Sequence, residues 1–183
     1  MTTIIGLSGS LRRGSYNSAL LRTAANLVPG GSTLDIASIR DIPLYDGDFE
    51  AEHGIPAPVT ALKDRIAAAD GLLLVTPEYN NSMPGVFKNA IDWLTRPAED
   101  IARVFGGKPV GIIGATPGGM GTTFAQTAWL PVLRTLGTRP FFGKTLYVSG
   151  AGKIFDASGQ LTDAALRERL RAYVEAFVAF VKR

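Results

Sequence analysis

Cysteine is absent from this chain of 183 residues, and histidine occurs once, as His53. The absence of thiols excludes a disulfide framework, a thiolate zinc site, a cysteine nucleophile and an iron–sulfur cluster. A single histidine also excludes a metal site built from several imidazoles. We therefore expect no metal site and look for other chemistry.

Long hydrophobic runs are also missing. The longest purely aliphatic run, Leu72 to Val75, has the length of a strand and falls far short of the ~18–20 residues of a membrane span. The N-terminus has no basic segment ahead of an apolar core, so we expect a cytoplasmic protein that contacts no membrane. The 19 lysines and arginines are scattered and leave a net charge of +3. This mild excess favours small anions and gives little reason to expect a nucleic-acid partner.

The composition is that of a globular protein. Hydrophobic residues make up 46% of the chain and charged residues 19%, unlike the charge-rich, apolar-poor composition of disordered chains. Since domains usually have ~100–200 residues, we expect residues 1–183 to form a single domain.

Short aliphatic runs alternate with amphipathic stretches of helical length, which is the pattern of repeated β-α units around a parallel sheet. The expected strands are residues 3–7, 33–39, 72–76, 110–114 and 145–149. The expected helices are residues 18–28, 59–69, 84–94, 122–136 and a C-terminal segment from residue 163. The turn-rich segment 41–58 is expected to be a surface loop, with His53 as one of its polar residues. The sequence therefore predicts a three-layer α/β domain.

In such a sheet, ligands bind outside the carboxyl ends of the strands. The loop after the first strand, residues 8–18, combines serines, two glycines, Arg12 and Arg13 with a helix N-terminus, which suits a phosphate. Ser15-Tyr16 stands where a nucleoside-triphosphate loop needs Lys followed by Ser or Thr, and Ser38-Ile39-Arg40 replaces the acid of a dinucleotide site. A terminal monophosphate remains. The alternative is that Ser15 or Asn17 merely caps the helix and the arginines face solvent.

Two further loops have unusual compositions. The loop after the third strand places Glu78, Tyr79 and two amides between Pro77 and Pro84, a rigid arrangement that suits a flat heterocycle or, alternatively, forms an ordinary turn before a helix. The loop after the fourth strand, residues 115–121, has three glycines, which permit close approach of a ligand or a flexible connection.

These loops together resemble the NAD(P)H-dependent FMN reductase family of flavodoxin-like fold, which includes bacterial quinone and chromate reductases. The matching segments are Gly9-Ser10-Leu11-Arg12-x-x-Ser15-x-Asn17, Thr76-Pro77-Glu78-Tyr79-Asn80 and Pro84-Gly85-x-x-Lys88-Asn89-Ala90-Ile91-Asp92-Trp93-Leu94. The resemblance implies a flavodoxin-like three-layer sandwich whose five-stranded parallel sheet has the order 2-1-3-4-5. It also implies FMN as cofactor and NADPH or NADH as co-substrate.

The resemblance further implies a set of cofactor-binding residues. The FMN phosphate would be held by Ser8, Ser10, Arg12, Ser15, Asn17 and Ser18; the isoalloxazine would be lined by Pro77, Glu78, Tyr79 and Asn80 and closed on its far side by Thr116, Pro117, Gly118 and Gly119. Many relatives carry serine near position 116, so Thr116 adds a methyl group at the ring. Because the flavin itself carries the chemistry, no catalytic side chain is expected. Arg13, Lys88 and Arg96 are either neighbours of the NADPH phosphates or solvated surface charges.

The implied activity is transfer of hydride from nicotinamide through FMN to a quinone, a free flavin or a similar small acceptor. The alternative is a flavodoxin-type electron carrier without substrate turnover, but such carriers are typically acidic, whereas the pI here is about 9.3. A receiver domain needs acidic residues where Ser8-Gly9-Ser10 and Thr76-Pro77 stand, and a hydrolase needs a G-x-S-x-G elbow that the chain lacks. The physiological acceptor and the choice between NADH and NADPH stay open.

A homodimer or homotetramer is also expected. The helix 84–94 carries more apolar residues than one face toward the sheet should absorb, and the next helix adds two: Val86, Phe87, Ala90, Ile91, Trp93, Leu94, Trp129 and Leu130. Such a surface usually marks an interface, and the resemblance implies that a neighbouring subunit walls the flavin pocket. The alternative is that segment 41–58 buries this helix within the chain.

Overall fold

A parallel sheet forms the middle layer of the computed structural model, which describes residues 1–183. Its strands are β1 (Thr2–Ser8), β2 (Ser32–Ala37), β3 (Gly71–Val75), β4 (Pro109–Ala115), β5 (Arg139–Pro140) and β6 (Tyr147–Val148). The order is β2-β1-β3-β4-β5, with β6 also paired to β4, and all pairs are parallel. This confirms the flavodoxin-like class and the strand order 2-1-3-4-5.

The last strand differs from the prediction of one strand over 145–149. Two short strands share that edge of the sheet: β5 pairs with the start of β4, and β6 pairs with its end, at Gly114 and Ala115. The first ladder extends past Pro140, because the N–H of Phe141 still donates to the carbonyl of Val110 (2.8 Å), and residues 141–146 then leave the sheet. The ring of Phe141 packs against Tyr173 and Phe177, at centroid distances of 5.4 and 5.6 Å.

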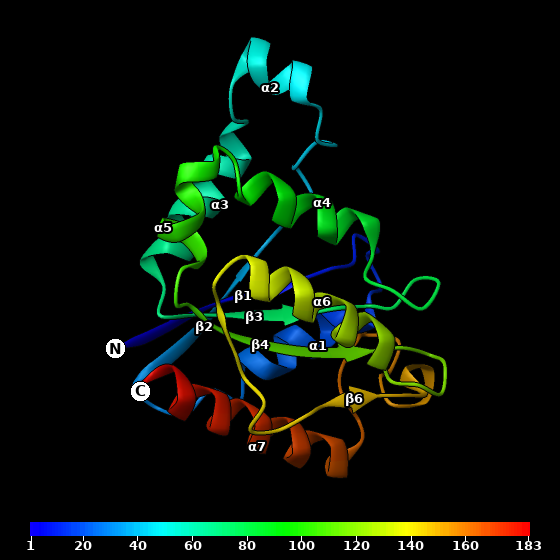
Figure 1. Cartoon of the computed structure of the whole chain (residues 1–183). Coiled ribbons are helices and arrows are strands. Elements are labelled where there is room, and N and C mark those ends of the chain that lie inside the picture. The colour runs from blue at the N-terminus through cyan, green and yellow to red at the C-terminus, as the bar shows by residue number, and fades with distance from the viewer.

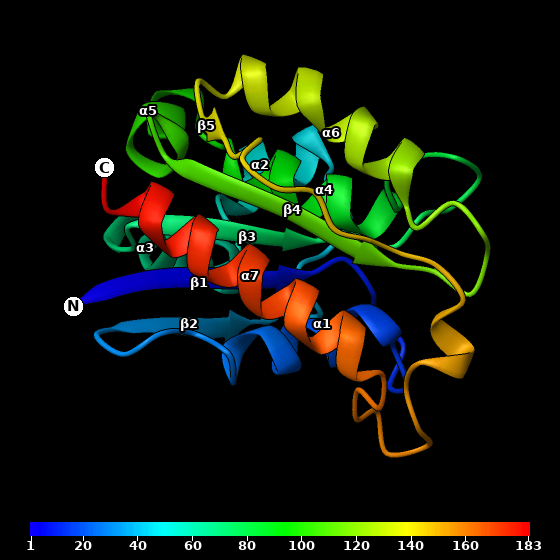
Figure 2. The ribbon, with the colours of Figure 1, turned by 90° about the horizontal axis from the view of Figure 1, so that it is seen from below.

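Helices cover both faces of the sheet (Figure 1). One face carries α1 (Tyr16–Ala25) and α7 (Ala164–Val181), which cross in front of the strands in Figure 2, and the other carries α3 (Ala57–Ala68), α4 (Gly85–Leu94), α5 (Ile101–Phe105) and α6 (Thr123–Thr135). The sheet has a hydrophobic core on each face, and alternate strand residues contribute to one core or the other. Ile4 belongs to the core under α1 and α7, and Ile5 to the core on the other face. Burial on both faces explains why β1 and β3 are nearly continuous apolar runs. None of the helices combines the length and hydrophobicity needed to cross a bilayer.

Segment 41–58 is not the plain loop that was expected. It contains the helix α2 (Gly47–His53), capped by Asp46, whose carboxylate accepts hydrogen bonds from the N–H groups of Asp48 and Phe49. His53 ends this helix and stacks on Phe49 at 4.6 Å. Since α2 buries none of its residues, it has no apolar periodicity from which it could have been predicted. The sequence analysis also missed two single turns, η1 (Ala98–Asp100) and η2 (Ala151–Lys153), and the helix α5. These elements are too short to show a helical periodicity.

Most apolar side chains of α4 are buried within the chain. Phe87, Trp93 and Trp129 have no exposed surface. Segment 41–58 covers this helix: the indole N–H of Trp93 donates to the carbonyl of Pro43 (2.9 Å), and Tyr45 meets the Trp93 ring edge-on at 5.0 Å. The surplus of apolar surface from which an interface was inferred is therefore largely absent, because segment 41–58 covers this helix; Val86 and Leu130 are partly exposed, and the homo-oligomer itself stays a prediction.

The three loops singled out in the sequence lie at one end of the sheet. Because the strands are parallel, the segments after β1, β3 and β4 meet at their carboxyl ends, while the N- and C-termini lie at the opposite end (Figures 1 and 2). The fold thus brings together the segments that follow Ser8, Val75 and Ala115, as expected for ligand sites in such sheets.

Candidate active site

The segment between β1 and α1 presents a row of free backbone donors. Its first residue, Gly9, donates to the carbonyl of Val75 (2.9 Å) and so fixes the segment to β3. After it, the N–H groups of Ser10, Leu11 and residues 13–17 donate to no other protein atom. Free donors at the N-terminus of a helix favour an anion through hydrogen bonds and the helix dipole.

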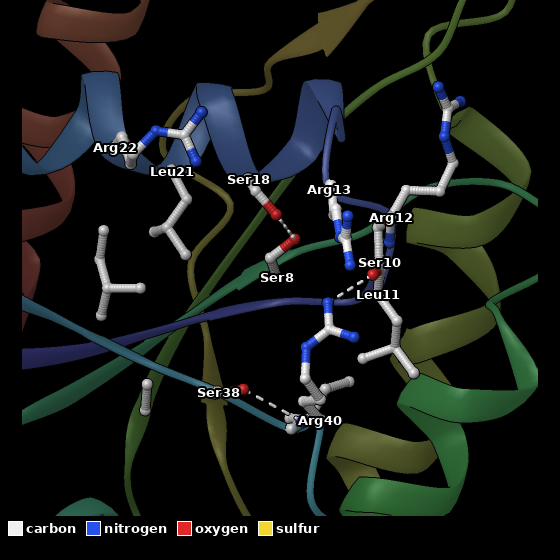
Figure 3. Close-up of a pocket in the computed structure, with 13 residues that line it drawn as sticks. Ser8, Ser10, Leu11, Arg12, Arg13, Ser18, Leu21, Arg22, Ser38 and Arg40 are labelled. Carbon is white, nitrogen blue, oxygen red and sulfur yellow. Dashed lines mark hydrogen bonds between the residues drawn. The ribbon is translucent and has the colours of Figure 1, made fainter. Parts of the chain in front are cut away.

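The six side chains predicted for a phosphate divide into two groups. Ser10, Arg12, Ser15 and Asn17 border one cleft. Ser8 and Ser18 lie on the other side of the segment, where their hydroxyls share a hydrogen bond of 2.9 Å (Figure 3). The six residues are therefore not all brought to one point.

Asn17 has a role that the sequence did not reveal. Its amide donates to the carbonyl of Ala115 (2.8 Å) and accepts from the N–H of the same residue (2.9 Å), and both groups are buried. This pair ties the first turn of α1 to the end of β4. Ser15 is the N-cap of α1 and accepts from the N–H of Ser18 (3.2 Å), so the capping alternative raised from the sequence is present for Ser15.

The loop after β3 is a tight turn. Tyr79 and Ser82 exchange two backbone hydrogen bonds of 3.0 Å, and the two residues between them, Asn80 and Asn81, have φ values of 50° and 58°. Two consecutive positive φ angles define a type I′ turn, and asparagine tolerates them well. The turn holds the Tyr79 ring outward, with 46% of its surface exposed.

Glu78 links this loop to α6. Its carboxylate accepts a hydrogen bond from the N–H of Ala125 (3.1 Å) in the first turn of that helix, where a negative charge is favourable. Glu78 is the only acidic residue that lines the cleft, and its charge is directed to the helix. No other carboxylate lines the cleft, so little negative charge is left there to repel an anion.

The glycine loop after β4 is anchored. The N–H of Thr116 donates to Val148 (2.9 Å), its carbonyl accepts from Ala151 (3.0 Å), and the carbonyl of Gly118 accepts from Gly150 (3.1 Å). These bonds hold the loop against the segment that follows β6. A flexible connection, the alternative considered from the sequence, does not describe it.

A cleft of about 230 Å³ joins the three loops. Most of the predicted residues line it, namely Ser10, Arg12, Ser15, Asn17, Pro77, Glu78, Tyr79, Thr116 and Pro117. Asn80, Gly118 and Gly119 belong to the same loops but lie outside its lining. Free N–H groups and Arg12 at one side fit a phosphate, and Pro77, Tyr79 and Thr116 at the other offer apolar and aromatic surface for a ring. The residues present fit a phosphorylated heterocycle such as FMN.

Fold and cleft together define a flavodoxin-like domain with a site for a flavin phosphate and ring. The sequence model of the NADPH-dependent FMN reductase family matches residues 2–153. The chain belongs to this family and is an NAD(P)H-dependent oxidoreductase of the FMN-using class, as the resemblance implied.

Individual relatives agree with this membership. An NAD(P)H-dependent FMN reductase of Pseudomonas aeruginosa is 45% identical over 180 residues, covering 98% of this chain and 95% of the relative. A quinone reductase of Escherichia coli strain K12 is 38% identical over 184 residues, covering 98% and 95%. Among solved structures, a flavoenzyme NAD(P)H:(acceptor) oxidoreductase from Paracoccus denitrificans is 36% identical, with a TM-score of 0.88 over 100% of this chain and 98% of the other.

Proposed function

We propose that this protein holds FMN in the cleft and reduces small quinones at the expense of NAD(P)H. The observation that carries the proposal is the arrangement at the cleft: free backbone N–H groups and Arg12 stand at one side, and Tyr79 and Thr116 stand at the other. A flavodoxin-type carrier would share this cofactor, but the relatives named as reductases cover nearly the whole chain.

The phosphate of FMN would be held by Ser10, Arg12, Ser15 and the free N–H groups that surround them. Each charge-assisted hydrogen bond contributes about 1.5–3 kcal/mol. Asn17 acts by fixing the first turn of α1 against Ala115, and the Ser8–Ser18 hydroxyl pair supports the segment from behind.

The ring of FMN would lie between the turn after β3 and the anchored glycine loop. Pro77, Glu78, Tyr79 and Asn80 would border one side of it, and Thr116, Pro117, Gly118 and Gly119 the other. FMN, when bound, supplies the hydride acceptance and donation, so the protein needs only to bind, orient and shield it. Apart from Arg12 and Glu78 the cleft lining is uncharged, which suits a neutral planar acceptor such as a quinone.

We also propose a cytoplasmic location and a homo-oligomer. The nicotinamide donor is a cytoplasmic nucleotide, and the chain has no cysteine to gain from an oxidising compartment. The oligomer rests on exposed apolar residues outside α4, such as Phe124 and Phe142, which are 44% and 69% exposed. Sedimentation at micromolar concentration tests it: a fully active 19.4 kDa species would contradict the oligomer.

The test of the cofactor site compares FMN with riboflavin. We expect the purified protein to retain FMN after desalting and to bind riboflavin much more weakly. Arg12→Ala and Ser15→Ala should each weaken FMN binding by about ten- to a hundredfold, since tenfold corresponds to about 1.4 kcal/mol, while riboflavin binding stays unchanged. Arg134→Ala, an exposed arginine on α6, is the control. Retention of neither flavin, or equal retention of both, would contradict the proposed site.

A further inference from the structure

A second hollow lies beside the cofactor cleft, on the opposite side of the segment that follows β1. It has a volume of about 390 Å³ and lies between α1 and the residues that follow β2. Ser10 and Arg12 line both the hollow and the cleft, so one segment of chain separates the two. Figure 3 shows the side chains of the hollow.

Three guanidinium groups from separate elements surround this hollow. Arg13 comes from the segment after β1, Arg22 from α1 and Arg40 from the residues after β2. In Figure 3 the side chains of Arg13 and Arg40 reach toward each other, whereas Arg12 extends in the opposite direction. The guanidinium groups of these successive arginines therefore point to different sides of the segment, although Arg12 also contributes to the lining of the hollow.

The positive charges of the hollow have no acidic partner. None of these arginines takes part in an ion pair, since the ion pairs of the chain involve other basic residues. No aspartate or glutamate lines the hollow. Collecting like charges in one place costs electrostatic energy, and a bound dianion would offset that cost.

Hydrogen bonds to the chain hold Arg40, one of the three arginines of the hollow, in place. Arg40 donates from one guanidinium nitrogen to the carbonyl of Leu11 (2.6 Å), and its backbone N–H donates to the hydroxyl of Ser38 (3.1 Å). The remaining N–H groups of the fork stay available for a bidentate contact with a phosphate. The hydroxyls of Ser8 and Ser18 lie beside them in Figure 3.

The floor of the hollow is apolar. Leu21 and Ile36 contribute to its lining, and Ile36 on β2 leaves 46% of its surface exposed. Guanidinium groups at the rim and aliphatic surface below suit a nucleoside that carries a phosphate. Inorganic phosphate would use only the rim.

We propose that this hollow binds the 2′-phosphorylated adenosine end of NADPH; this inference rests on the proposed function, which makes the nicotinamide nucleotide the electron donor. In dinucleotide-binding α/β folds, the end of the second strand reads the ribose: an acid accepts from a free 2′-hydroxyl, whereas an arginine binds a 2′-phosphate. Ser38 and Arg40 occupy that place here. The missing acid, which counted in the sequence against a dinucleotide at the segment after β1, therefore argues only against a free 2′-hydroxyl. The hollow would therefore select NADPH over NADH, a preference that the sequence left open.

The experiment uses FMN-loaded protein and two substitutions, Arg13→Gln and Arg22→Gln, at exposed residues outside the proposed FMN site. Calorimetric titration with adenosine 2′,5′-bisphosphate should show binding that each substitution weakens about tenfold, equal to about 1.4 kcal/mol; 5′-AMP should bind more weakly to the unsubstituted protein. In steady-state assays with a quinone, KM for NADPH should rise about tenfold, while kcat and KM for NADH stay within about twofold. Arg167→Gln on α7 removes an equally exposed charge and should change nothing.

Three results would overturn the inference. These are the absence of bisphosphate binding, equal affinity for 5′-AMP, and an equal rise of KM for NADH and NADPH. Failure of the proposed function would give a different result. The unsubstituted protein would then fail to oxidise NADH in the presence of FMN and a quinone. The titration with bisphosphate needs no turnover, so each failure can be assigned separately.

Discussion

Gly9→Ala should test how tightly the cofactor segment is held against the core. A Cβ built at Gly9 would lie 2.2 Å from Cδ1 and 2.8 Å from Cγ of Phe87, whereas carbon atoms prefer about 3.5–4.0 Å. Either the segment or the ring must therefore move by roughly 1.5 Å. The ring has little freedom, because Phe87 is fully buried and packs edge-on against Trp129 at 5.0 Å.

The expected cost of Gly9→Ala is about 2 kcal/mol, within the usual range for overpacking. For a chain of this size that is a fall in Tm of roughly 4–8 °C, and the displaced N–H groups should weaken FMN binding at least ~10-fold. Gly14→Ala in the same segment is the matched control, because its Cβ meets no atom within 4 Å. Thermal unfolding and flavin titration measure both effects. Unchanged Tm and affinity in Gly9→Ala would refute this reasoning, and Phe87→Leu should partly rescue a damaged variant.

Two further perturbations concern a hydrogen-bonded pair beside the cleft and an ion pair between α2 and the end of α4. Asn17→Ala should lower the free energy of unfolding by about 2–4 kcal/mol in chemical denaturation, because it leaves the buried N–H and C=O of Ala115 unpaired; an unchanged stability with weaker FMN binding would instead make Asn17 a phosphate ligand. The hydrogen bonds from Arg96, followed by that from Tyr45, hold the pKa of Glu50 below its ordinary 4.5. The contribution of this ion pair to stability is therefore present above pH 4.5 and is lost as the pH falls through the lower folded-state pKa. The Tm difference between the unsubstituted protein and Glu50→Gln should shrink as the pH falls below 4.5, and a constant difference would contradict this assignment.

The sheet could be predicted from the sequence because its central strands are buried on both faces. Such strands are continuous apolar runs, and β1 and β3 differ from the expected ranges by one residue at either end. Short elements on the surface carry no such pattern. The helix α2 buries no residue, and the edge strands β5 and β6 have only two residues each.

Only those parts of the candidate site that depend on local composition could be predicted from the sequence. Glycines, serines and arginines near a helix start indicated a phosphate segment, and most of the residues named for it do border the cleft. The pairing of Asn17 with Ala115 joins positions 98 residues apart, and the bond from Glu78 to Ala125 spans 47 residues. Contacts of this range depend on the strand order, and no periodicity in the sequence encodes them.

The segment after β1 separates the proposed FMN cleft from the hollow proposed for the nicotinamide nucleotide. The two binding sites can therefore change separately. Arg12 extends away from the other arginines, and Arg13 faces Arg40 in the second hollow (Figure 3). A substitution at one of these neighbours changes the charge on one side of the segment and leaves the backbone N–H groups of the other side in place. If the hollow binds the donor as proposed, we expect substitutions of Arg13, Arg22 and Arg40 to change selectivity for the nicotinamide nucleotide without loss of FMN, because the proposed FMN site uses Arg12 and the free backbone donors.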